Sequence, residues 1–487
     1  MKSGFYSKAA VAVIILGILL RAVLSFTNTI SGDACWHDTA AKFIAEEGKF
    51  PLYEQVGRDE PFWPPPLFHI ITAFFYSLFG EPGLKIAPFL FGSLALIFSY
   101  KLLRKMMGET ATFYATLFMA FIPIAVDYSV LGYVDSIIPF FTIAAIYFAI
   151  EKRFVMSGVM AGLGILAKYN VIFLIPVLMY IAWTKSNKDS RWKNVIIVTA
   201  IPIIISLPWF IRNWVLLHNP IWPFLNFVFH GYEAFPRGAY SGISLVNLSS
   251  IYTYVMIYLG FFGVPDGAYW LFFFYNIPYI WILISLFLAG TLIFVVPLFF
   301  GFGRNKHRKI FYVLIASFMV LFFLFELNVR PAVSRIMLPA LIGAAFVYGN
   351  GMEKIMKKYP QYSKIINIVI IVAIVGFIFA ESIKFTSATK SWNFYKDDFE
   401  WIKSNTDKDS VFLMSSQCIP LRIDRKSVFP SLSIDSNDYD YVWVNQDFRL
   451  EPQSRLSDEY IKKIESKNPQ TVYSNNRTKT SILKVQN

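Results

Sequence analysis

Charged residues are scarce in this chain, and cysteine is nearly absent. Only 16% of the 487 residues are charged, against about 25% in ordinary soluble domains, whereas 56% are hydrophobic and 18% are aromatic. This balance excludes a soluble globular protein and predicts a polytopic membrane protein. The two cysteines, Cys35 and Cys418, include no CxxC pair, which excludes a zinc site of the usual ligand spacing.

The basic residues do not form a nucleic-acid-binding surface. The formal net charge is +13, but Lys and Arg fall in short clusters between apolar runs and are not interleaved with aromatic residues. The N-terminal apolar run also lacks a small-residue cleavage site, and Arg21 interrupts it. We therefore predict a retained first span and not a signal peptide.

The clusters of Lys and Arg predict the orientation of the chain, because cytoplasmic loops are enriched in these residues. A spanning helix needs about 20 mostly apolar residues. Placing the interior basic clusters inside gives eleven spans with a cytoplasmic N-terminus, and a further hairpin within 212–276 would give thirteen. The predicted spans lie near residues 8–27, 84–103, 110–127, 134–150, 154–168, 169–183, 195–211, 277–302, 310–327, 335–350 and 365–382.

The composition changes abruptly near residue 384, which predicts two domains. Residues 1–383 are expected to form an all-α polytopic membrane domain, and residues 384–487 a small α/β domain outside the cell membrane. In the second domain, helical patterning alternates with strand-like segments. The expected helices are 396–405 and 457–466, and the expected strands are 410–414, 439–445 and 480–486.

A polar segment, residues 28–83, follows the first span, and we call it the first loop. Apolar residues from Trp36 to Ile44 recur at helical spacing, and Gly48 is a stop signal. The pattern predicts an amphipathic helix along the membrane interface, held there by Trp36, Phe43 and Ile44. Asp33 would lie at or before its first turn.

The second half of the first loop has a proline-rich entry. Three consecutive prolines, Pro64 to Pro66, force an extended backbone before Leu67. The apolar run that follows, 67–79, is too short to span a bilayer comfortably. We predict a re-entrant or interfacial helix.

The order of motifs resembles the GT-C superfamily of polytopic glycosyltransferases, which includes the protein O-mannosyltransferases and the lipid A aminoarabinose transferases. The resemblance covers roughly residues 1–350, and each motif is weak by itself. The shared order of the motifs, on one predicted face, carries the resemblance. The matching pieces are Gly32-Asp33, the helix to Gly48, Pro65-Pro66-Leu67, Asp135 in LGYVDSIIPFF, Lys168 in GLGILAKYNVIFLIP, LPWFIRNW at 207–214, and Arg335 in VSRIMLP.

The chain also departs from the family pattern. Ala34 follows Asp33 where many relatives carry glutamate, and Ile336 replaces the common tyrosine after Arg335. The Trp-Trp-Asp motif of oligosaccharyltransferases is absent from the sequence. Its absence argues against transfer of a whole oligosaccharide.

The resemblance implies a sugar donor carried on a polyprenyl or dolichyl phosphate. The acceptor hydroxyl then needs a base, and a carboxylate within hydrogen-bond reach would serve. Asp33 is the expected general base, although composition alone favours a helix N-cap for Asp33 or Asp38. A second acid is expected among Asp38, Asp59, Glu60 and Asp135.

The departing lipid phosphate needs cationic partners, ideally a guanidinium. Arg335 fits a family motif and opens a predicted span. Lys85 and Lys168 are alternatives that could equally reach toward lipid headgroups, and Arg212 could be an interface anchor. The candidates for phosphate binding are Arg335, Lys85, Lys168, Arg58, Arg212 and Arg330.

Two histidines, His37 and His69, occur in the first loop, where they could assist catalysis or be structural. No cofactor is required by the sequence. A divalent cation stays open because Asp33, His37 and Asp38 are close in sequence. The predicted metal-site assignment is nevertheless none, because this spacing is weak evidence for ligation and Arg and Lys can bind a monophosphate.

The preferred function is the transfer of one sugar from a lipid phosphate to a glycan, lipid or protein acceptor on the outer face. A transporter or flippase for an amphiphile is the main alternative, but transporters commonly show paired repeats, and none is visible here. A non-catalytic relative that binds lipid-linked sugar is a third hypothesis. Cys35 and Cys418 share the predicted outer side, so a disulfide and two free thiols are both compatible with the sequence.

Overall fold

The computed structural model describes residues 4–57, 60–232, 292–303, 305, 307–328, 334–430, 438–445, 461–462, 464 and 468–485. The chain divides into two compact units. The helical unit comprises Met1–Phe26, Trp63–Phe68 and Lys85–Ile383, and the α/β unit comprises Thr27–Phe62, His69–Leu84 and Lys384–Asn487. Each unit is described by itself.

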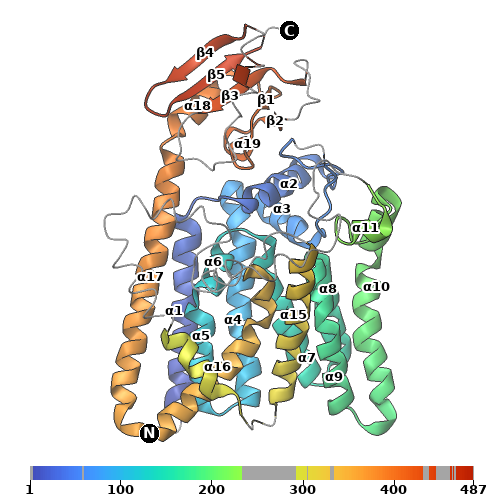
Figure 1. Ribbon diagram of the computed structural model, residues 1–487, viewed down its shortest axis with the longest axis vertical. Helices are drawn as coiled ribbons and strands as arrows, with labels where there is room; N and C mark the ends of the chain where they lie inside the picture. Colours follow the sequence, from blue (N-terminus) through green and yellow to red (C-terminus); the bar gives the residue numbers. More distant parts are fainter. Residues whose placement is uncertain are drawn as a thin grey trace. The chain divides into compact units, whose positions relative to one another are not determined.

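The helical unit is built from apolar helices (Figure 1). They are α1 (Phe5–Thr27), α4 (Ile86–Met106), α5 (Glu109–Phe121), α6 (Pro123–Val130), α7 (Ile138–Ile150), α8 (Phe154–Ala167), α9 (Ile175–Lys185), α10 (Arg191–Leu217), the short α11 (Asn226–Phe229), Leu292–Gly301, α15 (Arg308–Asn328), α16 (Leu341–Lys358) and α17 (Ser363–Asn393), whose last residues belong to the α/β unit. Short 3-10 segments lie before several helices of this set, including η1 (Glu81–Lys85), η2 (Val134–Ser136), η3 (Tyr169–Leu174) and η6 (Ser334–Ala340).

The helices confirm the prediction of an all-α polytopic membrane domain. Among the described residues, five helices are long and apolar enough to cross a membrane, or six if the bent pair α5 and α6 is one span. Shorter apolar helices occupy further predicted spans, including 134–150, 154–167 and 169–185. The predicted span 277–302 is described only from residue 292, and most of 212–276 lies outside the described residues.

Glycine allows α8 and α10 to pack closely. A Cβ atom on Gly158 would lie 2.9 Å from Ile201 Cβ, and one on Gly162 would lie 2.9 Å from Ile205 Cβ. Both glycines lie on α8, four residues apart, and both isoleucines lie on α10. Small residues at this spacing let helix backbones approach each other in membranes. The packing holds the end of α8, where Lys168 follows.

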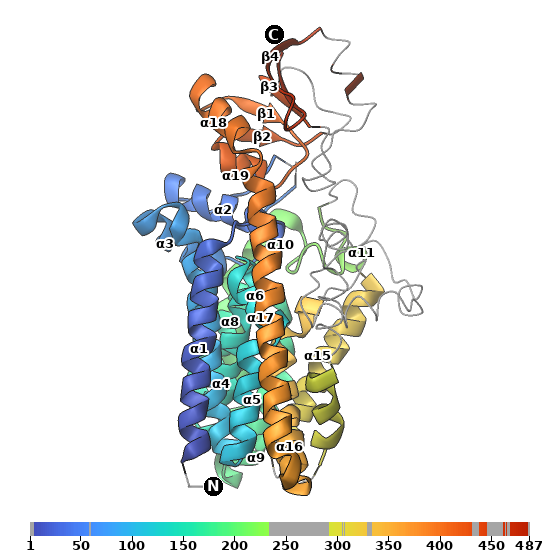
Figure 2. The same ribbon diagram turned by 90° about the vertical axis from the view of Figure 1, so that its left-hand side faces the viewer.

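A buried arginine donates hydrogen bonds to the backbone carbonyls at the break between α5 and α6. The two helices bend by 48° at Ile122, and Pro123 has no N–H to bond the carbonyl of Met119. The guanidinium of Arg21 on α1 donates to Met119 O (3.2 Å), Ala120 O (2.8 Å), Gly17 O (3.0 Å) and Ser129 Oγ (3.2 Å). Figure 2 shows α1, α4 and α5 side by side. The residue that interrupts the first apolar run therefore completes the backbone bonding of another helix.

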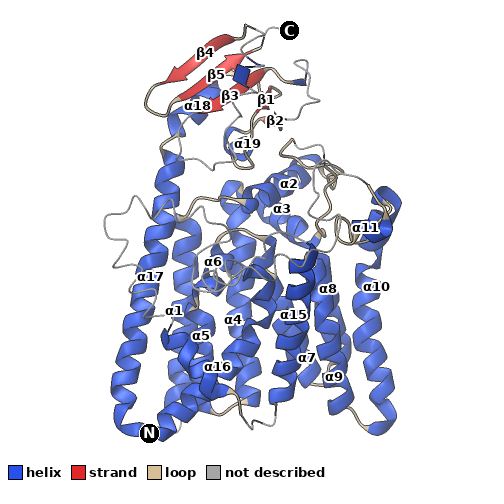
Figure 3. Cartoon of the chain, viewed as in Figure 1, coloured by secondary structure: helices blue, strands red, loops and turns tan. Residues whose placement is uncertain are grey.

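The C-terminal part of the α/β unit forms a five-stranded sheet of order β2-β1-β3-β5-β4 (Figure 3). β1 pairs in parallel with β2 and β3, and β5 pairs antiparallel with β3 and β4. The elements are α18 (Lys396–Asn405), β1 (Val411–Leu413), α19 (Ile419–Ile423), β2 (Lys426–Val428), β3 (Tyr441–Asn445), β4 (Gln470–Asn475) and β5 (Thr480–Lys484). The predicted α/β domain is confirmed, whereas β2 and β4 were not expected.

The first loop contributes two helices, α2 (Asp33–Glu47) and α3 (Leu67–Phe79). α2 ends as predicted at Gly48, whose φ of 65° is left-handed and whose N–H donates to Ile44 O. The predicted membrane anchor Trp36 is instead only 9% exposed and packs on Phe62, with ring centroids 5.4 Å apart. The expectation that Trp36 holds α2 in the interface was wrong, because the ring is covered by protein.

α3 exposes an apolar stripe that suits an interfacial helix. Ile70, Phe74 and Leu78 are each at least half exposed, and their spacing of four residues puts them on one helix face. A 13-residue helix is about 20 Å long, which is short for a span. The stripe is consistent with a helix that lies at the membrane surface.

The role of Arg21 yields a stability prediction. Arg21→Leu should lower the melting temperature measured by fluorescence in detergent, because each carbonyl left unbonded costs about 1–3 kcal/mol. The exposed Lys8→Leu on the same helix is the control and should melt like the wild type. Pro123→Ala restores an N–H for Met119, so Arg21→Leu should cost less in that background. Equal melting temperatures for Arg21→Leu and wild type would contradict the assignment.

Candidate functional site

Asp33 is the first residue of α2. Gly32 occupies the N-cap position with a φ of 66°, a backbone conformation that favours glycine. Neither Asp33 nor Asp38 is therefore the N-cap residue, which was the alternative role for both. A carboxylate in the first helical turn is stabilised by the free N–H groups and the helix dipole. Asp33 is half-buried, so part of its side chain stays accessible.

The other expected acids of the first loop are buried in the α/β unit. Asp38 is inside α2 and is fully buried, and Glu60 is 6% exposed. Asp59 and the candidate cation Arg58 lie outside the described residues. Among the described acids of this loop that were candidates, Asp33 is therefore more accessible than Asp38 and Glu60.

His37 and His69 form a direct hydrogen bond between α2 and α3. His37 Nδ1 lies 2.9 Å from His69 Nε2, and both side chains are buried. Phe62 meets the His69 ring edge to face, with centroids 4.9 Å apart. A bond of this kind needs one ring nitrogen to donate and the other to accept. The pair therefore couples the two helices, which supports the structural role of these histidines.

Three charged residues of the helical unit meet where its helices begin or end. Asp135 lies in η2 before α7, Lys168 follows α8, and Arg335 lies in η6 before α16. Lys168 Nζ donates to Asp135 Oδ1 at 2.6 Å, and Arg335 Nε lies 4.0 Å from Asp135 Oδ2. α7 and α8 form a hairpin, so the start of α7 and the end of α8 lie at the same end of the helices.

This cluster of Asp135, Lys168 and Arg335 has more positive than negative charge. The carboxylate is 1% exposed, whereas the side chains of Lys168 and Arg335 are 26% and 18% exposed. Arg335 also lies over the ring of Tyr133, 5.1 Å from its centroid. One buried carboxylate is thus shared by two partly accessible cations. Such an arrangement can receive an additional anionic group.

The remaining cation candidates have different surroundings. Lys85 is half-buried at the N-cap position of α4. Arg212 lies over the ring of Trp209, 4.5 Å from its centroid, and donates to Asn213 Oδ1 at 2.8 Å. These contacts favour the anchor role for Arg212. Arg330 lies outside the described residues.

Tyr169, next to Lys168, was not among the candidates from the sequence. Its hydroxyl accepts hydrogen bonds from Trp209 Nε1 (3.0 Å) and Asn213 Nδ2 (2.7 Å) and donates to Trp63 O (3.1 Å). Its ring stacks on Trp63, with centroids 6.4 Å apart. The bonds connect the proline-rich entry to α10. The signal in the sequence was a hydroxyl within an apolar run, because a buried hydroxyl requires partners.

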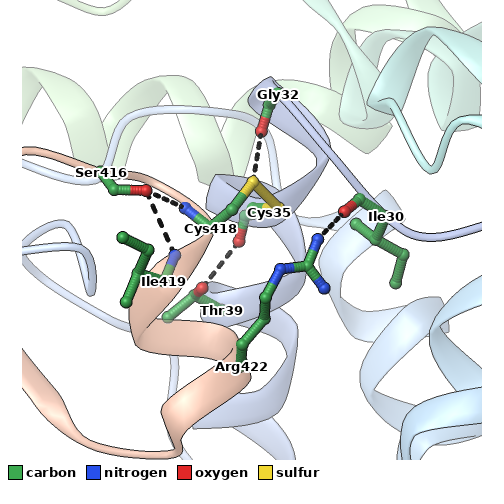
Figure 4. The surroundings of a disulfide bond; sticks show 8 residues. All are labelled: Ile30, Gly32, Cys35, Thr39, Ser416, Cys418, Ile419 and Arg422. Carbon is green, nitrogen blue, oxygen red and sulfur yellow. Dashed lines mark hydrogen bonds between the residues drawn. A yellow bond between two sulfur atoms is a disulfide. The ribbon is translucent and has the colours of Figure 1, made fainter. Parts of the chain in front are cut away.

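A disulfide joins the two cysteines. Cys35 on α2 is bonded to Cys418, and both residues belong to the α/β unit (Figure 4). Of the two alternatives that the sequence left open, the structure has the disulfide. Within the described residues, no group of three or more His, Cys, Asp or Glu side chains could hold a metal ion.

Comparisons with known proteins match both the sequence and the fold. Residues 63–211 match the family model of dolichyl-phosphate-mannose-protein mannosyltransferase. An undecaprenyl phosphate-alpha-4-amino-4-deoxy-L-arabinose arabinosyl transferase of Pseudomonas fluorescens is 27% identical over 155 residues, which is 27% of each chain. GPI mannosyltransferase 1 of Kluyveromyces lactis is 26% identical over 174 residues, which is 36% of this chain and 42% of the relative. The matches thus span less than half the length of these curated relatives.

Solved structures resemble the chain over nearly its whole length. ArnT from Cupriavidus metallidurans, bound to undecaprenyl phosphate, has a TM-score of 0.64 at 13% identity and covers 99% of this chain and 98% of its own. The oligosaccharyltransferase of Archaeoglobus fulgidus has a TM-score of 0.57 at 12% identity, covering 91% of this chain and 70% of its own. At these identities the likeness shows the fold.

The fold, the matched segment and the order of motifs agree with one another. The model match begins at Trp63, at the proline-rich entry, and includes Asp135 and Lys168. In its matched segment, its fold and the order of its motifs, the chain is similar to the GT-C superfamily of membrane glycosyltransferases.

Proposed function

We propose that the chain transfers a single sugar from a polyprenyl- or dolichyl-phosphate donor to an acceptor hydroxyl on the outer face of the cell membrane. The observation that carries the proposal is the cluster of Asp135, Lys168 and Arg335. Two cations share one buried carboxylate there, so a phosphate monoester or diester finds partners without a metal ion. Undecaprenyl phosphate bound to the similar ArnT supports a lipid phosphate as the donor.

Lys168 and Arg335 would have different tasks in this cluster. Arg335 presents a planar guanidinium, which can bind two phosphate oxygens in a fixed geometry. Lys168 supplies a compact charge that Asp135 holds in place through the 2.6 Å hydrogen bond. Asp135 is then a positioning residue for the phosphate-binding cations and not a second base. Its near-complete burial supports this role.

Asp33 is our candidate for the general base. In the proposed reaction, the acceptor oxygen attacks the anomeric carbon and its proton passes to the Asp33 carboxylate. The bond between the anomeric carbon and the phosphate oxygen breaks, and its electron pair leaves with the lipid phosphate. Lys168 and Arg335 would stabilise the charge that develops there. A single displacement of this kind inverts the configuration of the sugar.

The outer-face assignment has support from the disulfide. Disulfides form and persist in oxidising compartments and are rare in the cytosol. The Cys35–Cys418 bond involves the same helix as Asp33. A location of α2 outside the cytoplasmic membrane face is therefore consistent with its chemistry.

The buried Arg21 does not favour the transporter alternative. Transport would require polar groups within spans that bind a cargo. Arg21 donates hydrogen bonds to three backbone carbonyls and to Ser129 within the helical unit. The guanidinium binds the carbonyls at the break between α5 and α6, so its burial is not evidence for a path that a substrate would take through the helices.

Replacing the proposed base gives the most direct test. Asp33→Asn should lower kcat for sugar transfer by about 10²- to 10⁴-fold, because the amide cannot accept the proton. The rate is measured in membranes with a labelled polyprenyl-phosphate sugar, and products are identified by mass spectrometry. The matched control is Glu47→Gln, at the exposed end of the same helix, which should retain wild-type activity. Full activity of Asp33→Asn would sink the proposed role.

Replacing the cations should affect binding of the donor. Lys168→Met and Arg335→Met should each raise KM for the lipid-phosphate sugar by about tenfold or more, because charge-assisted hydrogen bonds contribute about 1.5–3 kcal/mol. The control is Lys357→Met on α16, whose side chain is 74% exposed. A second readout is the affinity for inorganic or lipid phosphate, measured with Lys168→Met and Arg335→Met each introduced into the Asp33→Asn protein. Both should bind phosphate more weakly than Asp33→Asn alone. Unchanged KM and phosphate affinity in both variants would exclude the cluster as the donor site.

A further inference from the structure

In the described part of the C-terminal sheet, the carboxyl end of β1 leads to a connection with α2. Ligands usually bind beyond the carboxyl ends of parallel strands, where the strand order switches sides. β1 is that strand here, because β2 pairs on one side of it and β3 on the other. The chain after β1 leads directly to Cys418 and α19. At this place it is joined to α2 of the same unit.

The connection between α19 and α2 begins with the disulfide. Ser416 Oγ accepts hydrogen bonds from the backbone N–H groups of Cys418 and Ile419, which fixes the start of α19. Cys418 is then bonded to Cys35, two residues after Asp33. Both cysteine side chains are fully buried. The covalent link therefore lies within one helical turn of the proposed base.

Arg422 holds the chain immediately before α2. Its guanidinium donates a hydrogen bond to the carbonyl oxygen of Ile30, as Figure 4 shows. The same group lies over the ring of Trp392, 3.9 Å from the ring centroid. Stacking fixes the orientation of a guanidinium that also donates hydrogen bonds. Arg422 thus restrains the backbone three residues before Asp33.

Asp424 holds α2 further along. Its carboxylate accepts a hydrogen bond from Lys42 Nζ, on the third turn of α2. Burial opposes ionisation, but the hydrogen bond and charge of Lys42, with Lys408 and Arg425, lower the pKa of Asp424 below its usual value. Burial likewise opposes the charge of Lys42, whose pKa is nevertheless raised by Asp424. The ion pair is present at neutral pH. It is lost as the pH falls through the lowered pKa of Asp424 or rises through the raised pKa of Lys42.

Val56 and Gly57, which follow α2 in the first loop, are also bound to the sheet. Ser427 Oγ in β2 donates to Val56 O at 3.0 Å, and Phe429 N donates to Gly57 O at 2.8 Å. A Cβ atom on Gly57 would lie 1.9 Å from Ser427 O, so only glycine allows this approach. The contacts attach both halves of the first loop to the C-terminal domain.

We propose that the C-terminal α/β domain is a clamp that positions α2, and with it Asp33, and that Arg422, Asp424 and Lys42 are positioning residues for the base. This inference rests on the proposed function of Asp33. α2 has 15 residues, and isolated helices of about this length are marginal in water. The clamp holds it before its first residue, within its first turn and in its third turn. Its role is to keep the carboxylate in one orientation.

The test compares variants of the clamp in the full-length protein in lipid nanodiscs. Asp424→Asn and Lys42→Met each remove the ion pair without touching Asp33. Both should lower kcat by about tenfold to a hundredfold, because a small misplacement of a reacting group has effects of this size, while KM for the donor stays unchanged. Hydrogen exchange of the amides in 33–47 should accelerate in both. The double variant Lys42→Asp with Asp424→Lys should recover kcat and slow exchange.

The controls separate positioning from general stability. Asp397→Asn breaks the ion pair with Arg477 (2.7 Å), which is exposed in the same domain and does not involve α2. It should leave kcat and exchange in 33–47 unchanged. The Cys35→Ser, Cys418→Ser double variant should behave like Asp424→Asn, and the ion-pair variants decide the question if it does not fold. Unchanged exchange of α2, or faster exchange with an unchanged kcat, would overturn the clamp.

The same experiment distinguishes failure of the clamp from failure of the proposed function. If Asp33→Asn keeps full activity, the assignment of the base is wrong, and with it the purpose of the clamp. If Asp33→Asn is inactive but the ion-pair variants match wild type in kcat and exchange, only the clamp is wrong. A parallel fall of kcat and melting temperature in Asp397→Asn would also refute it, because general loss of stability would then explain the effect.

Discussion

A helix break within a bilayer is tolerated only where other groups bond the carbonyls and amides that it frees. The bend between α5 and α6 meets this requirement through Arg21, which bonds the carbonyls of Met119 and Ala120 from a different helix. Asp135 and Arg335 lie in short 3-10 segments, and Lys168 directly precedes another. Irregular backbone and charge thus occur together in the helical unit. Because the backbone groups at the α5–α6 break are hydrogen-bonded, the otherwise apolar helices can accommodate it together with charged residues.

The two units divide the chemical requirements of the proposed reaction. The helical unit holds a cation-rich cluster, in which Asp135 orients Lys168. The α/β unit holds Asp33 on a helix that is bound through the disulfide and the Lys42–Asp424 ion pair. In the proposed reaction the leaving group requires positive charge and the acceptor requires a base. Each group has its own supporting residues in its own unit.

Local patterns in the sequence predicted local structure well. The apolar runs predicted the helices, Gly48 predicted the end of α2, and the alternating segments predicted β1, β3 and β5. Trp36 was misjudged because amphipathic spacing does not reveal whether lipid or protein covers the apolar face. That covering is a tertiary property, and Phe62 provides part of it.

The sequence could not predict which charges would pair. Asp135 and Lys168 were expected as a second acid and a phosphate ligand, but their contact depends on the hairpin of α7 and α8. Lys42 and Asp424 are 382 residues apart, and nothing in the sequence around either charge indicates that the two pair. Spacing rules apply along one helix or strand, whereas these contacts depend on how distant elements pack. The hydrogen bonds of the buried Arg21 to α5 likewise depend on how distant elements pack.

The disulfide has a consequence for the order in which the protein matures. Cys35 and Cys418 are separated by 383 residues, so α2 is synthesised early and its covalent partner near the end. The helix that carries Asp33 cannot be fastened until the ribosome has delivered the last span and the beginning of the C-terminal sheet. A prematurely terminated chain would insert its helices but lack this attachment. Synthesis of the C-terminal domain would then be required before α2 acquires its covalent attachment.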